Sequence, residues 1–170
     1  SYFNDSAVVT PEVLEKIAIC NVVAPLHNPA NLLGVEVATA QLPNLPQVVV
    51  FDTSFHQTMP EHAYLYATPR EWEHDYHVRR YGFHGTSHRF ITIKTAELLN
   101  KPLSDLNIIS AHLGNGSSVA AIRGGKSVDT SMGFTPLAGL IMGTPSGDID
   151  PALISSMAER LVTDAGGVFD

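Results

Sequence analysis

Three stretches of this sequence hold residue types that suit phosphate chemistry. The turn Gly114-Asn115-Gly116 lies between two apolar runs, and its glycines let a ligand approach backbone N–H groups, which bind anions. Asp52 ends the apolar run at 48–51, where a carboxylate faces the crevice in which open sheets bind ligands. The segment at 79–88 places two arginines and two histidines around glycines. Taken alone, the Gly-Asn-Gly tripeptide is more typical of a plain hairpin turn.

The turn is predicted to join the first two strands of an antiparallel meander, with strands at 108–113, 117–122 and 126–130. The apolar run at 47–52 is predicted to be another strand, covered on both faces because its apolar residues are continuous. A hairpin whose first turn binds phosphate recurs in the actin/hexokinase/Hsp70-like ATPase architecture. The predicted fold class is therefore α/β, a β-meander plus helices.

Helices are predicted on both sides of these strands. Thr10 and Asn28 each precede a proline and are typical N-caps, so two helices are expected to run to about Cys20 and Gln41. The second of these is predicted to be largely buried. A third helix is expected to begin at Thr86 or Ser87, and a fourth after Asp150. Their predicted inward faces are Phe90, Ile93, Ala96 and Leu99 in the third, and Ile154, Met157, Ala158 and Leu161 in the fourth.

Composition narrows the class of protein. The chain has 170 residues and a net charge of −7, which argues against non-specific binding to nucleic acid or to anionic membranes. Its apolar runs are all shorter than the roughly 20 residues of a membrane span. One cysteine, Cys20, and the lack of a visible signal peptide favour the cytoplasm.

Six motifs together resemble the acetate/propionate/butyrate kinase family, and they cover nearly the whole chain. They are PLHNP (25–29), VFDTSFHQTMP (50–60), RRYGFHGTSH (79–88), HLGNGSSVAAI (112–122), GKSVDTSMGFTPLAGLIMGT (125–144) and SGDIDP (146–151). The resemblance implies reversible phosphoryl transfer from ATP to acetate, giving acetyl phosphate and ADP, with Mg²⁺. It also implies an incomplete actin/hexokinase/Hsp70-like architecture, with residues 1–53 from the C-terminal part of a first domain and 54–170 from the N-terminal part of a second.

The resemblance assigns roles to matching positions. Asp52, His84 and His27 fall on catalytic residues, with Asp52 organising Mg²⁺ directly or through water rather than acting as a base. For His27 a structural role beside the helix cap stays open. The nucleotide-phosphate loop is His112, Leu113, Gly114, Asn115 and Gly116, and the wall of the acyl pocket is Leu26, Phe83 and Pro136.

The remaining charged and histidine residues are predicted to be structural. His56 and His88 are expected to be supporting hydrogen-bonding groups, whereas His62, His74 and His77 are expected to be exposed. Arg79 and Arg80 are predicted to be structural or rim charges. Asp148 and Asp150 read as a turn residue and a helix cap.

Two features depart from the family pattern. Pro145 stands where the family has an arginine that stabilises the transition state, and proline supplies neither charge nor backbone donor. The family's first phosphate loop and its C-terminal adenosine pocket are also absent. The 170-residue chain is therefore expected to be inactive by itself, as part of a protein that is a homodimer. A propionate or butyrate kinase and a non-catalytic nucleotide-binding or interaction remnant remain alternatives.

Overall fold

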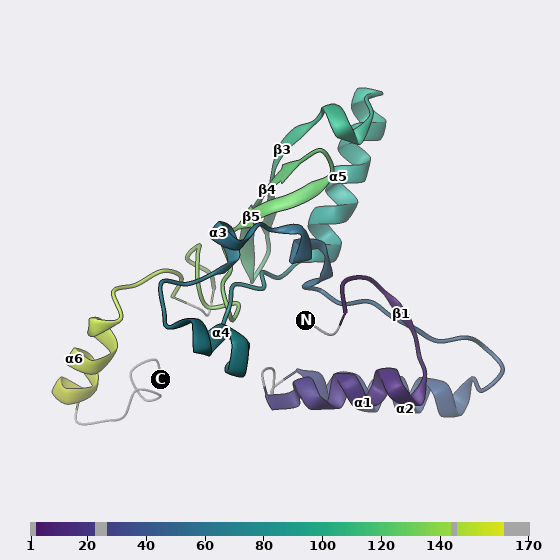
Figure 1. The fold of residues 1–170 in the computed structure, drawn as a ribbon, viewed down its shortest axis with the longest axis horizontal. Coiled ribbons are helices and arrows are strands. Elements are labelled where there is room, and N and C mark those ends of the chain that lie inside the picture. Colours follow the sequence, from purple (N-terminus) through teal and green to yellow (C-terminus); the bar gives the residue numbers. More distant parts are fainter. Residues whose placement is uncertain (1–2, 23–26, 144–145, 162–170) are drawn as a thin grey trace.

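The computed structural model describes residues 3–22, 27–143 and 146–161, which form helices and two small sheets (Figure 1). The first sheet pairs β1 (Ala7–Val8) with β2 (Val48–Val49), antiparallel. The second sheet has three strands in the order β3-β4-β5. The α/β class is confirmed.

Two helices pack side by side beyond the first sheet. α1 (Pro11–Ile19) begins as predicted, because Thr10 Oγ1 accepts a hydrogen bond from Val13 N at 3.3 Å. α2 (Asn28–Gln41) begins one residue earlier than predicted, and His27 rather than Asn28 occupies the cap position without a side-chain hydrogen bond. Asn28 Nδ2 instead donates to Ile17 O, at 3.4 Å, and so ties α2 to the end of α1.

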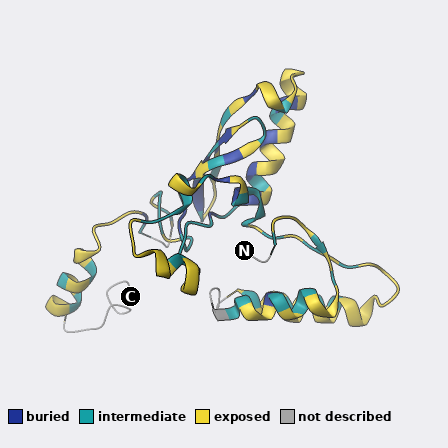
Figure 2. Ribbon diagram, in the orientation of Figure 1, coloured by how far each residue is buried: buried dark blue, intermediate teal, exposed yellow. Residues whose placement is uncertain are grey.

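Two burial predictions for this part of the chain are wrong. α2 has no buried residue, and Leu33 is 61% exposed, because the helix packs mainly on α1 and the short 3₁₀ helix η1 (Cys20–Val22) along one side (Figure 2). β2 is only two residues long; Val48 within it is 58% exposed and Val50, directly after it, is 59% exposed. Its partner strand β1 is equally short.

The three-stranded meander is present where it was predicted. β3 (Asn107–Leu113) pairs with β4 (Ser117–Arg123), and β4 pairs with β5 (Lys126–Thr130), with an irregularity between Ala121 and Ile122. α5 (Gly85–Leu99) packs on β3, and the 3₁₀ helix η2 (Ser54–Thr58) packs on both β5 and α5. This body holds most of the buried core.

α5 turns an unexpected face toward the sheet. Its buried residues are Gly85, His88, Thr92 and Ala96, so of the predicted inward face only Ala96 is buried. Phe90, Ile93 and Leu99 are 57%, 39% and 51% exposed. The polar face can be buried because its side chains find partners: Thr92 Oγ1, for example, donates to His88 O at 2.7 Å.

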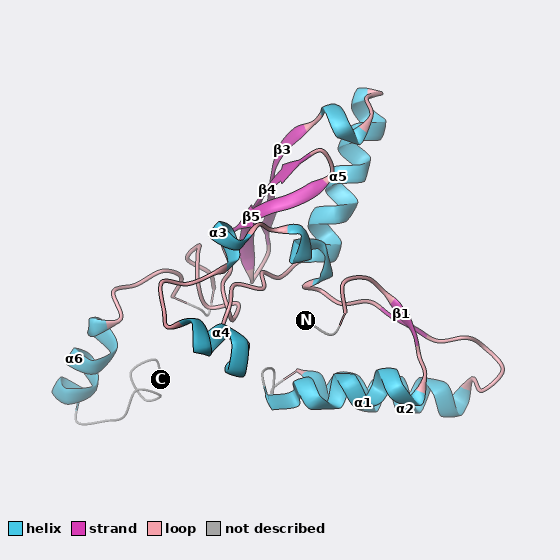
Figure 3. Ribbon diagram, in the orientation of Figure 1, coloured by secondary structure: helices cyan, strands magenta, loops and turns pink. Residues whose placement is uncertain are grey.

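The remaining elements are short (Figure 3). They are α3 (Glu61–Tyr64), α4 (Arg70–Tyr76), the 3₁₀ helix η3 (Leu103–Asp105) and α6 (Ala152–Leu161). Asp150 caps α6 as predicted, accepting from Ala152 N at 2.9 Å, but the predicted inward face of α6 is wrong because the helix has no buried residue. Among the helices of the described ranges, none has the length and apolar character to cross a membrane.

Candidate functional site

Asp52 joins the first sheet to the start of α5. Its Oδ2 accepts a hydrogen bond from His84 N at 2.7 Å, and its backbone carbonyl accepts one from Gly85 N at 2.9 Å. His84 has a left-handed backbone, with φ of 57°, which costs energy for a residue with a side chain and is held here by these two bonds. A Cβ on Gly85 would collide with Asp52 O, so only glycine fits there.

His84 and His112 stack in front of the glycine turn. Their ring centroids lie 4.0 Å apart and the rings are 22° from parallel. His84 Nδ1 lies 2.9 Å from Ser118 Oγ, and His112 Nδ1 lies 2.9 Å from Ser87 Oγ. Both rings are therefore fixed through Nδ1, which leaves the two Nε2 atoms available.

Both Nε2 atoms face the glycines of the turn. A Cβ placed on Gly116 would lie 3.2 Å from His84 Nε2, and one on Gly114 would lie 3.4 Å from His112 Nε2. Within the turn, Gly114 N donates to Gly116 O at 3.1 Å, so this N–H is not free for a ligand. The N–H groups of Asn115 and Gly116 have no hydrogen-bond partner within the described part of the chain. Two imidazoles thus lie against a turn that has two unpaired amides among the described residues.

The electrostatics beside this turn favour a neutral His84 imidazole. Burial and the neighbouring His112 lower the pKa of His84 below its ordinary value, and the Asp52 carboxylate opposes the shift. A neutral imidazole has one N–H and one acceptor nitrogen, and each can serve a phosphate or a hydroxyl.

His56 and His88 are buried supports, as predicted. Both are 0% exposed. His56 bonds Ser127 Oγ at 2.8 Å and Phe83 O at 3.0 Å, which links η2 to β5 and to the segment before α5. Burial lowers the pKa of His56, and burial together with His56, His84 and His112 lowers that of His88 to about 4.

The predicted structural charges are confirmed. Arg80 Nη1 donates to the carbonyls of residues 130–132, at 2.7 Å for Thr130, and Arg79 lies over the Tyr64 ring at 3.7 Å. Asp148 Oδ1 accepts from Gly139 N at 2.7 Å and closes a loop. The three remaining histidines, His62, His74 and His77, are exposed.

Several predicted site residues are not brought to this cluster. His27 is exposed at the start of α2, on the helical hairpin away from the meander (Figure 1). Phe83 contributes its carbonyl to His56, and Pro136 is half-buried, with no contact between the two residues among the described interactions. Leu113 is 76% exposed. Leu26 and Pro145 lie outside the described residues.

The loop before Pro145 does reach the turn. Gly143 N donates to Asn115 O at 3.3 Å, and a Cβ on Gly143 would lie 2.5 Å from Asn115 Oδ1. Gly143, two residues before the family's arginine position, therefore lies at the same turn.

Sequence reasoning missed Ser87 and Ser118, which fix the two imidazoles. A partial signal existed for Ser118 alone, because the strand register sets it directly opposite His112 and so beside the stacked rings, although it bonds His84. It depends on pairing two strands across the turn, which the predicted meander already contained.

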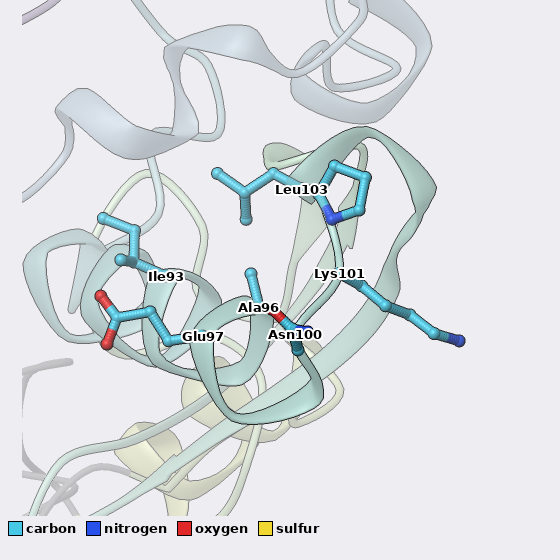
Figure 4. A pocket seen from close by; sticks show the side chains of 7 residues that line it. Ile93, Ala96, Glu97, Asn100, Lys101 and Leu103 are labelled. Atoms are coloured by element: carbon cyan, nitrogen blue, oxygen red, sulfur yellow. The ribbon is translucent and has the colours of Figure 1, made fainter.

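A hollow of the described surface lies elsewhere. It is an open groove of about 440 Å³ at the C-terminal end of α5, lined by Ile93, Ala96, Glu97, Asn100, Lys101, Pro102 and Leu103 (Figure 4). None of the cluster residues lines it, so it is not part of the candidate site.

Two solved structures that are similar to this chain are an acetate kinase and a propionate kinase. An acetate kinase structure from Porphyromonas gingivalis is similar over 98% of this chain and 42% of that chain, with a TM-score of 0.92 and 50% identity. A propionate kinase structure from Francisella tularensis has the same TM-score at 47% identity, over 98% of this chain and 43% of that chain. The fold is thus that of a carboxylate-phosphorylating class of kinases, over part of their length.

The chain belongs to the acetokinase family, whose family model matches residues 1–168. The acetate kinase of Shouchella clausii is 59% identical over 158 residues, which is 93% of this chain and 40% of that protein. The chain therefore spans about 40% of the length of the curated relatives that it matches.

Proposed function

We propose that the protein to which this chain contributes is an acetate kinase, which transfers the terminal phosphoryl group of ATP to acetate, reversibly and with Mg²⁺. The observation that carries the proposal is the convergence of Asp52, His84, His112 and the 114–116 turn in a member of this family. Direct in-line transfer needs alignment of the reactants and neutralisation of phosphate charge more than covalent catalysis. The imidazoles and turn amides of this cluster are hydrogen-bond donors of the type that such transfer uses.

The residues of the cluster fit a phosphate group. Gly114 and Gly116 leave open the space that a Cβ would fill beside the two Nε2 atoms, and the N–H groups of Asn115 and Gly116 in the same turn have no partner among the described residues. His84 Nε2–H is proposed to donate to an oxygen of the transferred phosphoryl group, an interaction worth about 10²–10³ in rate at comparable sites.

Asp52 is proposed to act by its charge. Acetate is already ionised at pH 7, so the reaction needs no base to deprotonate it. Asp52 uses Oδ2 to accept from His84 N, and no described hydrogen bond occupies Oδ1, which suits a contact to Mg²⁺ directly or through water. Bound Mg²⁺ would supply neutralisation of phosphate charge.

The finer arrangement is proposed on the family resemblance. Residues 1–53 would end a first domain and 54–170 would begin a second, in the actin/hexokinase/Hsp70-like architecture. The helical hairpin and the meander body support this division (Figure 1), and Asp52 lies in the chain between β2 and η2. Leu26, Phe83 and Pro136 are proposed to line the acyl pocket and His27 to join the site in the complete protein, which we propose to be a cytoplasmic homodimer.

Propionate is a second candidate substrate. The TM-score to the Francisella propionate kinase equals the TM-score to the Porphyromonas acetate kinase. Acetate and propionate are therefore both retained as candidate substrates. An apolar pocket separates substrates that differ by one methylene by only about 1–3 kcal/mol.

A chimera tests the proposal. Residues 1–170 replace the matching segment of the Porphyromonas gingivalis enzyme, and acyl phosphate is trapped as hydroxamate with acetate, propionate or butyrate. We expect activity that is highest with acetate and falls at least about 10²-fold in His84→Ala. This chain alone is expected to be inactive.

Position 145 needs a matched pair of chimeras, one with Pro145 and one with Pro145→Arg. A higher turnover number with arginine is expected, since an arginine aimed at a transferred phosphoryl group can contribute about 10³–10⁵ in rate. A folded Pro145→Arg chimera that forms no acyl phosphate would refute the acetate kinase proposal.

A further inference from the structure

A continuous line of hydrogen bonds runs from the interior to the candidate phosphate site. Ser110 Oγ lies 2.9 Å from His88 Nδ1, His88 Nε2 lies 2.9 Å from Ser118 Oγ, and Ser118 Oγ lies 2.9 Å from His84 Nδ1. Ser110, His88 and Ser118 are 3%, 0% and 0% exposed. Within the described residues, these three bonds account for all the hydrogen bonds of the two hydroxyls and of the His88 ring.

If the Ser118 hydroxyl hydrogen is to have an acceptor, the protons along this line run in one direction or the other. An arrangement in which Ser118 accepts from both rings leaves its own buried hydrogen without an acceptor among the described residues. In the first direction, Ser110 O–H donates to His88 Nδ1, His88 Nε2–H donates to Ser118 Oγ, and Ser118 O–H donates to His84 Nδ1. The ring proton of neutral His84 is then on Nε2. In the second, every bond is reversed and His84 carries its proton on Nδ1.

The end of the line decides between the two directions. In the second direction, Ser110 accepts from His88 and its own hydroxyl hydrogen has no acceptor among the described residues. A buried donor without a partner is costly. In the first direction, every buried donor of the line has an acceptor, and the one free N–H is that of His84, at the partly open end of the line.

We propose that Ser110, His88 and Ser118 are positioning residues that hold His84 as its Nε2–H tautomer and thereby aim an N–H donor at the 114–116 turn. That this donor serves a phosphoryl oxygen rests on the proposed function; the tautomer itself does not. Ser110 never contacts His84, and it acts only through His88 and Ser118.

One observation agrees with this ordering. Burial lowers the pKa of His88 to about 4, so at neutral pH His88 has the single ring proton that a relay requires. His112, in the same stack, lies outside the line, because its Nδ1 contacts Ser87 Oγ and, among the described residues, no further ring extends that bond.

Nuclear magnetic resonance of the 170-residue chain labelled with ¹⁵N-histidine tests the proposal without any substrate. In a neutral imidazole the protonated and unprotonated nitrogens resonate far apart, so long-range ¹H–¹⁵N correlation spectra identify the tautomer of each ring. We expect His84 and His88 both to be protonated on Nε2. A wild-type spectrum with His84 protonated on Nδ1 overturns the proposal with no variant needed.

Ser110→Ala removes the hydroxyl that sets the direction. The two ring-nitrogen shifts of His84 are then expected to move toward each other, as the two tautomers become mixed. The matched control is Ser127→Ala, which removes the serine bonded to His56 Nδ1 in the same core but outside the line. Ser110→Thr, which keeps a hydroxyl, should restore the wild-type His84 shifts.

Equal His84 shifts in Ser110→Ala and Ser127→Ala would refute the positioning role. The Nε2–H tautomer in this chain, together with an inactive Pro145→Arg chimera, would instead uphold the line of hydrogen bonds and refute the kinase proposal. The two failures are therefore distinguishable.

Discussion

Acid is expected to destabilise this chain well above the pH at which carboxylates titrate, because two histidines are buried in neutral form. The pKa of His88 falls from 6.5 to about 4 on folding, so between these values the unfolded chain binds a proton that the folded chain does not. Stability conferred by a neutral His88 is full above pH 6.5 and is lost as the pH falls toward 4. The lowered pKa of His56 acts in the same direction.

The magnitude follows from the His88 values. The full difference corresponds to about 3 kcal/mol, of which about 2 kcal/mol is lost between pH 8 and pH 5. Domains of this size have about 5–15 kcal/mol in all, so the loss is a large fraction. With a urea dependence of about 2 kcal/mol per molar, the unfolding midpoint should fall by about 1 M.

Urea unfolding followed by far-ultraviolet circular dichroism at pH 8 and pH 5 measures this difference. His88→Gln should reduce the pH dependence while leaving the contribution of His56. His62→Gln, at an exposed position on α3, should leave it unchanged. The reasoning would be refuted by a urea midpoint that is the same at both pH values, or by a difference between the two midpoints that His88→Gln leaves unaltered.

Three further substitutions test the contacts around the site by their urea midpoints. Gly82→Ala should lower the free energy of unfolding by about 2 kcal/mol or more, since φ is 71° and a Cβ would collide with Thr130. Its control, Gly34→Ala in the open middle of α2, should raise the free energy of unfolding by about 0.5–1 kcal/mol, and equal effects of the two substitutions would contradict the argument. Arg80→Ala should cost about 2–3 kcal/mol through its lost carbonyl bonds, with Arg80→Lys recovering part; full recovery by Lys would show that the forked geometry is unimportant. Asp52→Ala should cost about 1 kcal/mol by removing the acceptor for the backbone N–H at the start of α5, and Asp52→Asn much less; equal losses would exclude this role.

Local patterns predicted the elements whose ends are set by nearby residues. Thr10 caps α1 and Asp150 caps α6 because each oxygen reaches a backbone N–H two or three positions further along the chain. The meander followed from two glycine turns between short apolar runs. These are short-range energies, and the sequence near each residue contains all the atoms that determine them.

Burial was predicted less well, because it depends on what covers an element. The apolar residues of α2 and of the 47–52 run resemble those of a buried helix and strand, but in this chain one side of each lies open. The polar face of α5 is buried for the opposite reason. His88 contacts Ser110 and Ser118, which are 22 and 30 residues away in the sequence, and their hydrogen bonds compensate for the desolvation of a buried polar ring.

The sequence by itself determined the family, the meander and the chemical groups of the candidate site, since motif residues and turn glycines can be recognised without coordinates. Only the tertiary structure decided how those groups meet. It fixed which nitrogen of each stacked imidazole is occupied by a serine, and it separated His27 from the cluster that holds Asp52 and His84. The physical reason is that hydrogen bonds between distant segments depend on their relative placement, which hydrophobic periodicity and capping preferences do not encode.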